Sequence, residues 1–326
     1  MIAITEQKKG CMVTMPLDPD LTPGTVVIGK WKNNKYIIQR VLGKGANGIV
    51  YLVQREPGGG RYALKMGFNP LDLQSEINVL TSLAKKDHHL GGRNGFSSYL
   101  KEVDNYQVGG REISFYVMTY VRGEPLHLFI RRNGPEWMML VGLRILKKLA
   151  ELHRLGYIFC DLKPQNVLVS SYGEVELIDY GGASPVGRSV KQFTEWYDRG
   201  YWNAGSRVAD QKYDVFSFAL LLIHLLEGEE LRRTTGNSLP QLRGIPALLT
   251  IIHKSERLAS YRSWLQKAIQ GDYDDAEDAF LSWKKQVYRV RSGPKNASSE
   301  PTPGWLIPSF ALSALIMAGA VILMLR

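Results

Sequence analysis

Two short runs that carry polar residues, each joined to an apolar segment, are the most specific pattern in this sequence. The first run is Cys160–Asn166, and it leads into the apolar segment Val167–Val169. The second is Asp179–Gly181, and it follows the largely apolar segment Val175–Ile178. Short aliphatic segments bounded by polar residues are typical of buried strands. The acids of both runs therefore stand at strand ends, which disfavours the alternative of two ordinary surface or capping acids.

The chemical groups in these runs match the needs of phosphoryl transfer, which requires a positioned hydroxyl, a divalent cation and positive charge beside the transferred group. In the pattern D-x-K-x-x-N, Asp161 would accept the proton of the attacking hydroxyl and Lys163 would lie beside the γ-phosphate. Asn166 and Asp179 would each hold a metal ion, either Mg²⁺ or Mn²⁺. We therefore expect the first two residues to be catalytic and the other two to be metal ligands.

An upstream glycine-rich run fits the pattern G-x-G-x-x-G-x-V at every fixed position. The predicted strand Tyr36–Val41 precedes it, and the predicted strand Ile49–Val53 continues from it. Glycines let a backbone approach phosphate groups closely, although such a run taken alone is often only a turn. Because strands flank this run, we expect it to bind the phosphates of ATP through Gly43, Lys44, Gly45, Gly48 and Val50.

A lysine and a glutamate further along form a candidate ion pair. Ala63 and Lys65 give the A-x-K of a third strand, whose lysine would neutralise the α- and β-phosphates. Glu76 is the candidate carboxylate that holds this lysine, because it starts a helical spacing with Leu80 and Leu83 that would pack the leucines on the lobe. It comes only eleven residues after the lysine. A solvated helix acid is the alternative for this glutamate.

In these motifs and their order, the chain resembles the eukaryotic-like (Hanks-type) serine/threonine protein kinases of bacteria. The resemblance spans roughly Tyr36 to the 280s. It implies an α+β fold of two lobes, a small β-rich N-lobe and a larger helical C-lobe, with ATP as phosphate donor and proteins as substrates. Among such kinases, the chain is most similar to the tail-anchored type that lacks an extracellular sensor domain and is found in spore-forming bacteria.

The resemblance also assigns residues outside the two opening runs. Met118–Gly123 resembles the hinge that binds adenine, so Thr119 and Val121 would contact the base, as would Leu168. Asp214 resembles the buried acid at a helix start that bonds the backbone of the catalytic loop. Its role in the family is structural, and we do not expect it to be catalytic.

The chain departs from the family pattern at three places. Phe159 and Cys160 stand where histidine and arginine normally precede the catalytic aspartate, so the arginine that contacts a phosphorylated activation loop is missing. Since a phosphate orders a loop only where a cation meets it, we expect activation by contact or dimerisation. Tyr180 replaces a phenylalanine, and the Ala-Pro-Glu that ends the activation segment is absent near Gly200–Gly205. Thr194 is the candidate for the threonine that contacts the catalytic aspartate and lysine.

Two functional classes follow from these matches and departures. The first is an active serine/threonine kinase that phosphorylates proteins and itself. The second is a membrane-anchored pseudokinase scaffold, which the departures suggest. We favour the enzyme because every group expected to touch ATP or metal is present. The family associates Lys163 with serine and threonine substrates.

Length and composition fit one such domain with a tail. The chain has 326 residues, 44% of them hydrophobic, which can bury a two-lobed core of about 250 residues. We expect an N-terminal extension at 1–35, the kinase domain at 36–290, a basic, Pro- and Ser-containing linker at 291–304 and a transmembrane helix at 305–325. The two cysteines give no disulfide framework, and residues 1–20 lack the apolar core of a signal peptide.

The run Trp305–Leu325 contains no charged side chain. As a helix it would be about 30 Å long, enough to cross the apolar core of a bilayer. A buried globular helix is the alternative, which the apolar character on all faces of the run disfavours. Only Arg326 follows, and the nearby basic residues precede the run. We therefore expect a single-pass, tail-anchored protein of the cell membrane with its kinase domain in the cytoplasm.

Two further partners are expected from weaker signals. Small residues at Ala314, Ala318 and Gly319 could let two membrane helices pair in a homodimer, although such residues are frequent in any membrane helix.

Of the net charge of +10, about half comes from a basic stretch that suits anionic lipid, namely Lys284, Lys285, Arg289, Arg291 and Lys295. The remaining excess could bind DNA or an acidic partner. No nucleic-acid motif accompanies this charge, so solvated lysines are the default interpretation.

Overall fold

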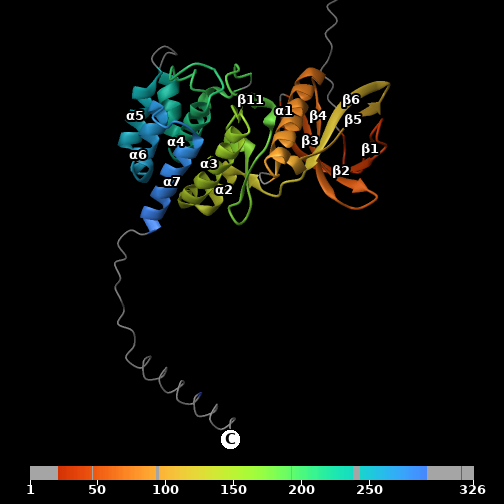
Figure 1. Cartoon of the computed structure of the whole chain (residues 1–326), viewed down its shortest axis with the longest axis horizontal. Helices are drawn as coiled ribbons and strands as arrows, with labels where there is room; N and C mark the ends of the chain where they lie inside the picture. Colours follow the sequence, from red (N-terminus) through yellow and green to blue (C-terminus); the bar gives the residue numbers. More distant parts are fainter. Residues whose placement is uncertain are drawn as a thin grey trace, which may run out of the picture. The chain divides into compact units, whose positions relative to one another are not determined.

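The computed structural model describes residues 21–45, 47–92, 95–191, 193–237, 243–291 and Met317. In this part of the chain a β-rich lobe precedes a helical lobe, as the change from orange to blue in Figure 1 shows. The described residues up to Trp283 belong to one compact unit, and a second unit begins at Lys284, within the last helix. The first unit has the two-lobed α+β architecture that the sequence predicts.

One antiparallel sheet forms the N-lobe, with the strand order β1-β2-β3-β4-β6-β5. Its strands are β1 (Val26–Ile28), β2 (Lys35–Gly45), β3 (Gly48–Glu56), β4 (Arg61–Gly67), β5 (Leu100–Val108) and β6 (Arg111–Thr119). The two edge strands approach each other through a bridge between Gly29 and Tyr106. The Lys30 amide also donates to the Asn105 carbonyl at 2.8 Å. These contacts nearly close the sheet around one interior.

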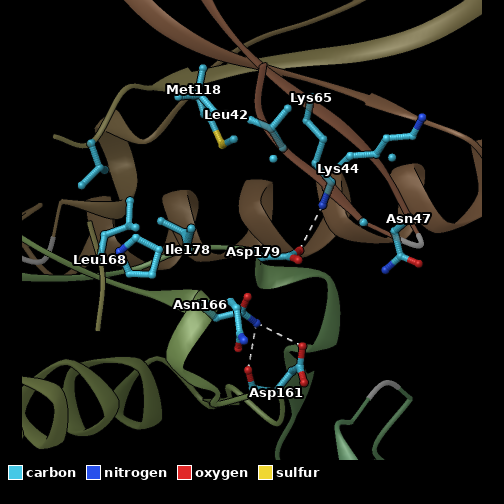
Figure 2. A pocket seen from close by; sticks show the side chains of 18 of the residues that line it. Leu42, Lys44, Asn47, Lys65, Met118, Asp161, Asn166, Leu168, Ile178 and Asp179 are labelled. Carbon is cyan, nitrogen blue, oxygen red and sulfur yellow. Dashed lines mark hydrogen bonds and ion pairs between the residues drawn. The ribbon is translucent and has the colours of Figure 1, made fainter. Parts of the chain in front are cut away.

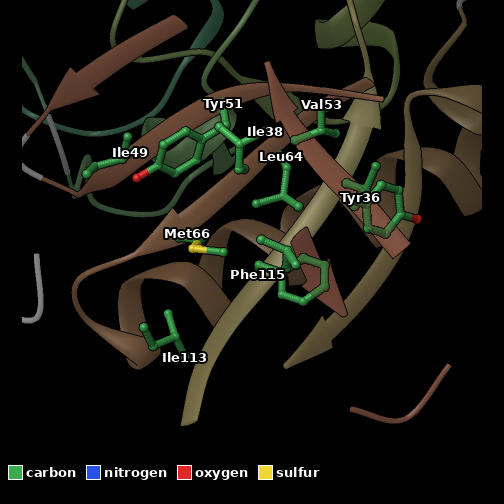
Figure 3. Packing of buried hydrophobic residues seen from close by; sticks show 11 residues of the cluster. Tyr36, Ile38, Ile49, Tyr51, Val53, Leu64, Met66, Ile113 and Phe115 are labelled. Atoms are coloured by element: carbon green, nitrogen blue, oxygen red, sulfur yellow. The ribbon is translucent and has the colours of Figure 1, made fainter. Parts of the chain in front are cut away.

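Apolar side chains from alternate strand positions fill this interior (Figure 3). On β3, Ile49, Tyr51 and Val53 point inward, as the two-residue period of a strand requires. The buried cluster consists of Val27, Tyr36, Ile38, Ile49, Tyr51, Val53, Leu64, Met66, Ile113, Phe115 and Val117. Because β-branched and aromatic residues suit a pleated surface, both strands predicted around the glycine run form, and each extends further than predicted.

Residues before the predicted domain start at 36 also contribute to this lobe. Val27 of β1 pairs with Tyr36 and is buried in the cluster, and Leu21 packs against the same cluster. Residues 21–35 of the predicted extension are therefore part of the sheet and its core.

Asp104, on β5, fixes the turn that follows β1. Its carboxylate accepts hydrogen bonds at 3.0, 2.8 and 2.7 Å from the backbone amides of Trp31, Lys32 and Asn105. Burial raises the pKa of Asp104, but these three hydrogen bonds outweigh it and hold the pKa below its usual value. The ionised carboxylate thus links the turn after β1 to the opposite edge strand.

The helix α1 (Pro70–His89) packs beside this sheet (Figure 1). Asn69 caps it, since its side-chain oxygen accepts an amide hydrogen bond of the first turn at 2.9 Å, and proline at the first position needs no amide partner. Leu80 and Leu83 are buried in the lobe, and Glu76 is buried as well. The helical spacing read from the sequence is therefore correct, and the glutamate is not a solvated acid.

The C-lobe contains the remaining helices and two small sheets. The helices are α2 (Leu126–Asn133), α3 (Met138–Arg154), α4 (Gln211–Asn237), α5 (Ile245–Lys254), α6 (Arg262–Gln270) and α7 (Ala276–Arg291). The small sheets are built from β7 (Glu124–Pro125), β8 (Tyr157–Ile158), β9 (Val167–Val169), β10 (Val175–Leu177) and β11 (Ser184–Pro185). Since β9 and β10 pair antiparallel, both polar runs of the opening motif are held at the ends of one hairpin.

Aromatic side chains hold the helices of this lobe together. Trp283 packs edge-on against Trp264 and Phe218, with ring centroids 5.0 and 5.4 Å apart. Gly142 on α3 makes room for this cluster, because a Cβ there would lie 2.7 Å from the Trp283 ring. The helices therefore form a packed base for the loops that precede α4.

The predicted transmembrane helix at 305–325 lies, apart from Met317, outside the described residues. No helix of the described ranges has the length and hydropathy of a membrane span.

We predict that Asp104→Asn lowers the free energy of unfolding by about 1–3 kcal/mol at neutral pH, because amide donors lose a charged acceptor. Since the folded-state pKa of Asp104 is below its unfolded-state value, this contribution is present above the usual carboxyl pKa and is lost as the pH falls through the folded-state value. Chemical unfolding of both proteins between neutral pH and pH 3 measures it. A stability difference that stays constant over this range would contradict the prediction.

Candidate active site

A cavity of about 930 Å³ lies between the N-lobe sheet and the loops that follow β8 and β10. Figure 2 shows its apolar end, bounded by Leu42, Met118, Leu168 and Ile178. Charged and polar groups gather at the other end, where the figure shows Lys65, Asp179, Asn166 and Asp161. An apolar slot beside a cluster of charges suits a ligand with a flat ring and an anionic tail.

Three predicted residues of the loop after β8 meet Thr194, which lies in the segment after β11. Asp161 Oδ2 accepts hydrogen bonds from Lys163 Nζ at 2.6 Å and from Asn166 Nδ2 at 3.0 Å. Thr194 Oγ1 donates to Asp161 Oδ1 at 2.8 Å, so the threonine contact expected from the sequence is present. Three side chains therefore fix the orientation of this aspartate at the cavity wall.

Asp214, near the start of α4, holds the same loop from outside the cavity. Its carboxylate accepts hydrogen bonds from the amides of Phe159 and Cys160 at 2.7 and 2.9 Å, and His153 Nε2 lies 2.8 Å away. Cys160 has a φ of 66°, a left-handed conformation that a non-glycine residue keeps only where its surroundings hold it. Burial raises the pKa of the Cys160 thiol, so this residue is a protonated structural cysteine.

Lys65, on β4, stands between two carboxylates. Its Nζ lies 2.7 Å from Glu76 Oε2 and 3.0 Å from Asp179 Oδ1, so the expected pair with Glu76 forms despite the short spacing. Burial lowers the pKa of Lys65, but the two carboxylates outweigh it and hold the pKa above its usual value. Burial raises the pKa of Asp179, but the Lys65 charge outweighs it and holds the pKa below its usual range. Both groups are therefore charged at neutral pH.

The glycine-rich run forms the turn between β2 and β3, where Gly45 pairs with Gly48. Of the three motif glycines, only Gly48 has a backbone that demands glycine. Its φ is 150°, and a Cβ there would lie 2.1 Å from the Met66 carbonyl oxygen. A Cβ at Gly43 or Gly45 would meet nothing within 4 Å, so these two glycines leave space over the cavity.

Every predicted site residue except Glu76 lines the cavity, including Thr119 and Val121 of the hinge. These lining residues also include three predicted residues that have not been described so far, namely Lys44, Val50 and Ala63. Sequence reasoning missed several lining residues, namely Leu42, Asn47, Tyr99, Tyr116, Gln165, Lys191 and Phe193. Leu42 adjoins the glycine run and could have been found there. Tyr99 and Tyr116 carry no local signal, because their position depends on strand packing far along the chain.

Bonds within the chain hold the segment that follows Asp179. Tyr180 is buried and packs edge-on against three rings, those of Phe96, Tyr99 and Phe159. Further on, residues 187–190 pair through their backbone with residues 207–209. These hydrogen bonds run from the Gly187 amide to Ala209 O (2.8 Å), from the Ala209 amide to Arg188 O (2.7 Å) and from the Val190 amide to Arg207 O (3.0 Å).

Two ion pairs occupy the region where Ala-Pro-Glu is absent. Arg199 donates to both carboxylate oxygens of Asp210, at 2.8 and 2.5 Å. Arg207 donates to Asp198 at 2.7 Å, and the Tyr213 hydroxyl donates to the same buried carboxylate at 2.8 Å. A bidentate pair and a multiply bonded buried acid fix geometry strongly. The chain therefore orders this loop without the family motif.

The donors at the charged end fit a hard divalent cation. Asp179 contributes carboxylate oxygens, and Asn166 directs its Nδ2 to Asp161, which leaves its side-chain oxygen as a donor. In the described ranges no group of three or more His, Cys, Asp or Glu side chains could enclose a metal ion. A cation that takes few protein oxygens and shares those of a phosphate, as Mg²⁺ does, suits such a site.

We predict that Gly48→Ala lowers the free energy of unfolding by about 2 kcal/mol or more, because its backbone conformation and the Met66 carbonyl leave no room for a Cβ. Gly45→Ala is the matched control in the same turn, and its effect stays below about 1 kcal/mol. Denaturant unfolding of the two variants measures the difference. Equal effects at both positions would show that the turn is not restricted as described.

The family model of the protein kinase domain matches residues 36–270. Serine/threonine-protein kinase YabT of Bacillus subtilis (strain 168) is 37% identical over 287 residues, which cover 86% of this chain and 80% of that protein. Serine/threonine-protein kinase F of Synechocystis is 25% identical over 221 residues, 60% of this chain and 44% of that protein. The solved structure of vaccinia related kinase 3 has the same fold, with a TM-score of 0.58 at 14% identity over 83% of this chain and 93% of that one. The chain belongs to the protein kinase family, as an ATP-dependent protein serine/threonine kinase.

Proposed function

We propose that the residues around this cavity transfer the γ-phosphate of ATP to serine or threonine hydroxyls of protein substrates and of the chain itself. The observation that carries the proposal is the position of Asp161. This carboxylate is oriented by Lys163, Asn166 and Thr194, and it shares one cavity with the charged pair of Lys65 and Asp179. An oriented base beside a phosphate-binding cation is what phosphoryl transfer requires from a protein.

Each residue has a distinct role in this proposal. Asp161 accepts the proton of the substrate hydroxyl, and its contacts with Thr194 and Asn166 hold it in line for that proton. Lys163, within hydrogen-bonding distance of this carboxylate, places positive charge where the transferred group gathers negative charge. Lys65 binds the phosphates nearer the nucleoside, and the apolar end of the cavity holds the adenine ring between Val50, Ala63 and Leu168.

Asn166 and Asp179 are the proposed ligands of a divalent cation, with Mg²⁺ as the first candidate and Mn²⁺ as the second. When bound, such a cation would neutralise phosphate charge and act as a Lewis acid. The chain prepares for it by holding Asp179 ionised through Lys65.

The pseudokinase scaffold is the competing proposal, and the departures at Phe159 and Cys160 are its support. Phe159, however, is buried against Tyr180. The backbone amides of Phe159 and Cys160 donate hydrogen bonds to Asp214, which hold the loop in place. The departures thus affect packing and regulation, whereas the groups around Asp161 are complete. Because the groups expected to react are present, we favour an active kinase over a pseudokinase scaffold.

We further propose that contact between copies of the chain, and not a phosphate on the activation segment, controls activity. The arginine that would meet such a phosphate is replaced by Cys160. Backbone pairing and the pairs Arg199–Asp210 and Arg207–Asp198 already hold the segment and the loop after it. An ordered segment leaves less for a phosphate to organise.

We predict that Asp161→Asn and Lys65→Ala each lower phosphate transfer at least about 100-fold, because one removes the base and the other the phosphate-binding cation. Transfer from labelled ATP to the chain itself and to a generic protein measures the loss. The exposed Asp274→Asn is the control and keeps native activity. Equal labelling by the native chain and both site variants would favour the scaffold instead.

We propose in addition that residues 305–325 anchor the protein in the cell membrane, with the kinase domain in the cytoplasm. The support is the uncharged run itself and the basic residues that precede it. Pairing of two such helices would bring two kinase domains together. The binding of DNA to the remaining basic residues stays a prediction.

We predict that replacing Leu312 and Leu315 together by arginine releases the full-length protein from membranes, since each arginine at a helix centre costs about 2.5–3.5 kcal/mol of insertion free energy. Alkaline extraction of membranes followed by sedimentation measures the release. The matched control is the double variant Asn296→Arg and Ala297→Arg, which lies outside the uncharged run and leaves the protein in the pellet. Full extraction of the native chain would remove the proposal.

A further inference from the structure

Tyr116 lies on β6, where alternate residues face opposite sides of the sheet. Phe115 and Val117 point into the core of the N-lobe. Tyr116 and Met118 line the cavity on the other side. The tyrosine is 1% exposed, so its hydroxyl requires a partner inside the protein.

That partner is the carboxylate of Glu76 on α1. The Tyr116 hydroxyl donates to Glu76 Oε1 at 2.8 Å, while Lys65 Nζ lies 2.7 Å from Glu76 Oε2. Both oxygens of this 3%-exposed carboxylate are therefore occupied, one by a neutral donor and one by a charged donor. A group held at both oxygens cannot rotate to follow the lysine.

The second bond matters because Lys65 has another carboxylate within reach. Its Nζ lies 3.0 Å from Asp179, the proposed metal ligand. If Glu76 were held by the lysine alone, a small movement of α1 would leave Lys65 with Asp179 only. The hydroxyl on β6 ties α1 to the sheet independently of the lysine.

The far end of α1 has an anchor of its own. Lys86 Nζ donates to the Leu155 carbonyl at 2.8 Å, at the C-terminal end of α3, and lies over the Tyr157 ring. This bond fixes the helix to the C-lobe about ten residues after Glu76. Tyr116 is thus an anchor on the side of the helix where Glu76 lies, in addition to Lys65.

We infer that Tyr116 is a positioning residue for phosphoryl transfer, whose hydroxyl fixes Glu76 and through it the place of Lys65 relative to Asp179. The inference rests on the proposed roles of Lys65 and Asp179. According to this inference, a residue of β6 helps to position α1. The chain lacks the arginine that, in the family, contacts a phosphate on the activation segment.

The test uses Tyr116→Phe, Glu76→Gln and the double variant in the full-length protein. Tyr36→Phe is the matched control, because Tyr36 is an equally buried tyrosine of the same sheet whose hydroxyl donates to Glu102 at 3.1 Å, away from the cavity. The measurements are kcat and KM for ATP, the thermal midpoint, and hydrogen exchange of the α1 amides without nucleotide.

We expect Tyr116→Phe to lower kcat about tenfold with KM for ATP changed less than about threefold, because misalignment reduces the fraction of bound substrate that can react. The α1 amides exchange faster in this variant and not in Tyr36→Phe. Both variants lose a similar number of degrees in the thermal midpoint, since each loses one buried hydrogen bond. In the Glu76→Gln background, Tyr116→Phe lowers kcat by less than about twofold, as coupled residues require.

A kcat of Tyr116→Phe within twofold of native, beside an inactive Lys65→Ala, overturns the positioning role and leaves the proposed function intact. Effects of Tyr116→Phe and Glu76→Gln that multiply independently overturn it as well. Absence of activity in the native protein overturns the proposed function itself.

Discussion

The charged end of the cavity depends on the two ion pairs that the Lys65 ammonium group makes with Glu76 and Asp179. This group joins β4 to the next element, the helix α1, through Glu76, and it joins both to the segment after β10, far along the sequence, through Asp179. Buried charges are tolerated only where they compensate one another. Lys65 compensates the Asp179 carboxylate, and its positive charge also faces the cavity where the phosphates of a nucleotide would lie. The same contact that assembles the lobes therefore prepares the site for its ligand.

Chain-specific bonds replace the family motifs that are missing. The absent arginine before Asp161 would have contacted a loop phosphate, and here the activation segment is ordered by backbone pairing with residues 207–209. The absent Ala-Pro-Glu is replaced by the ion pairs of Arg199 and Arg207. Phe159 in place of histidine adds a ring to the cluster around Tyr180. In each case the chemistry of the cavity is kept while its support changes.

The sequence predicted the residues whose role is written in local spacing. The D-x-K-x-x-N run, the glycine run, the A-x-K strand and the helix carrying Glu76 all lie where their patterns indicated, because strand ends and helix periodicity fix them locally. Residues 21–35 were assigned to an extension, since nothing in that stretch shows that Val27 pairs into the sheet.

Long-range packing accounts for what the sequence did not predict. The hydroxyl of Tyr116 reaches Glu76 from forty residues away, and the partners of Arg199 and Arg207 depend on how a loop folds back. Such contacts have no periodicity and no fixed spacing.

Calorimetric titration of the full-length protein with a non-hydrolysable ATP analogue, with and without Mg²⁺, measures whether the cavity binds a nucleotide together with a cation. We expect one analogue to bind per chain, more tightly with Mg²⁺ than without it, and we expect Mg²⁺ to make no difference in an Asp179→Asn protein. If the native protein takes up no analogue, or if the Asp179→Asn protein responds to Mg²⁺ as the native one does, the cavity does not bind nucleotide and cation as proposed.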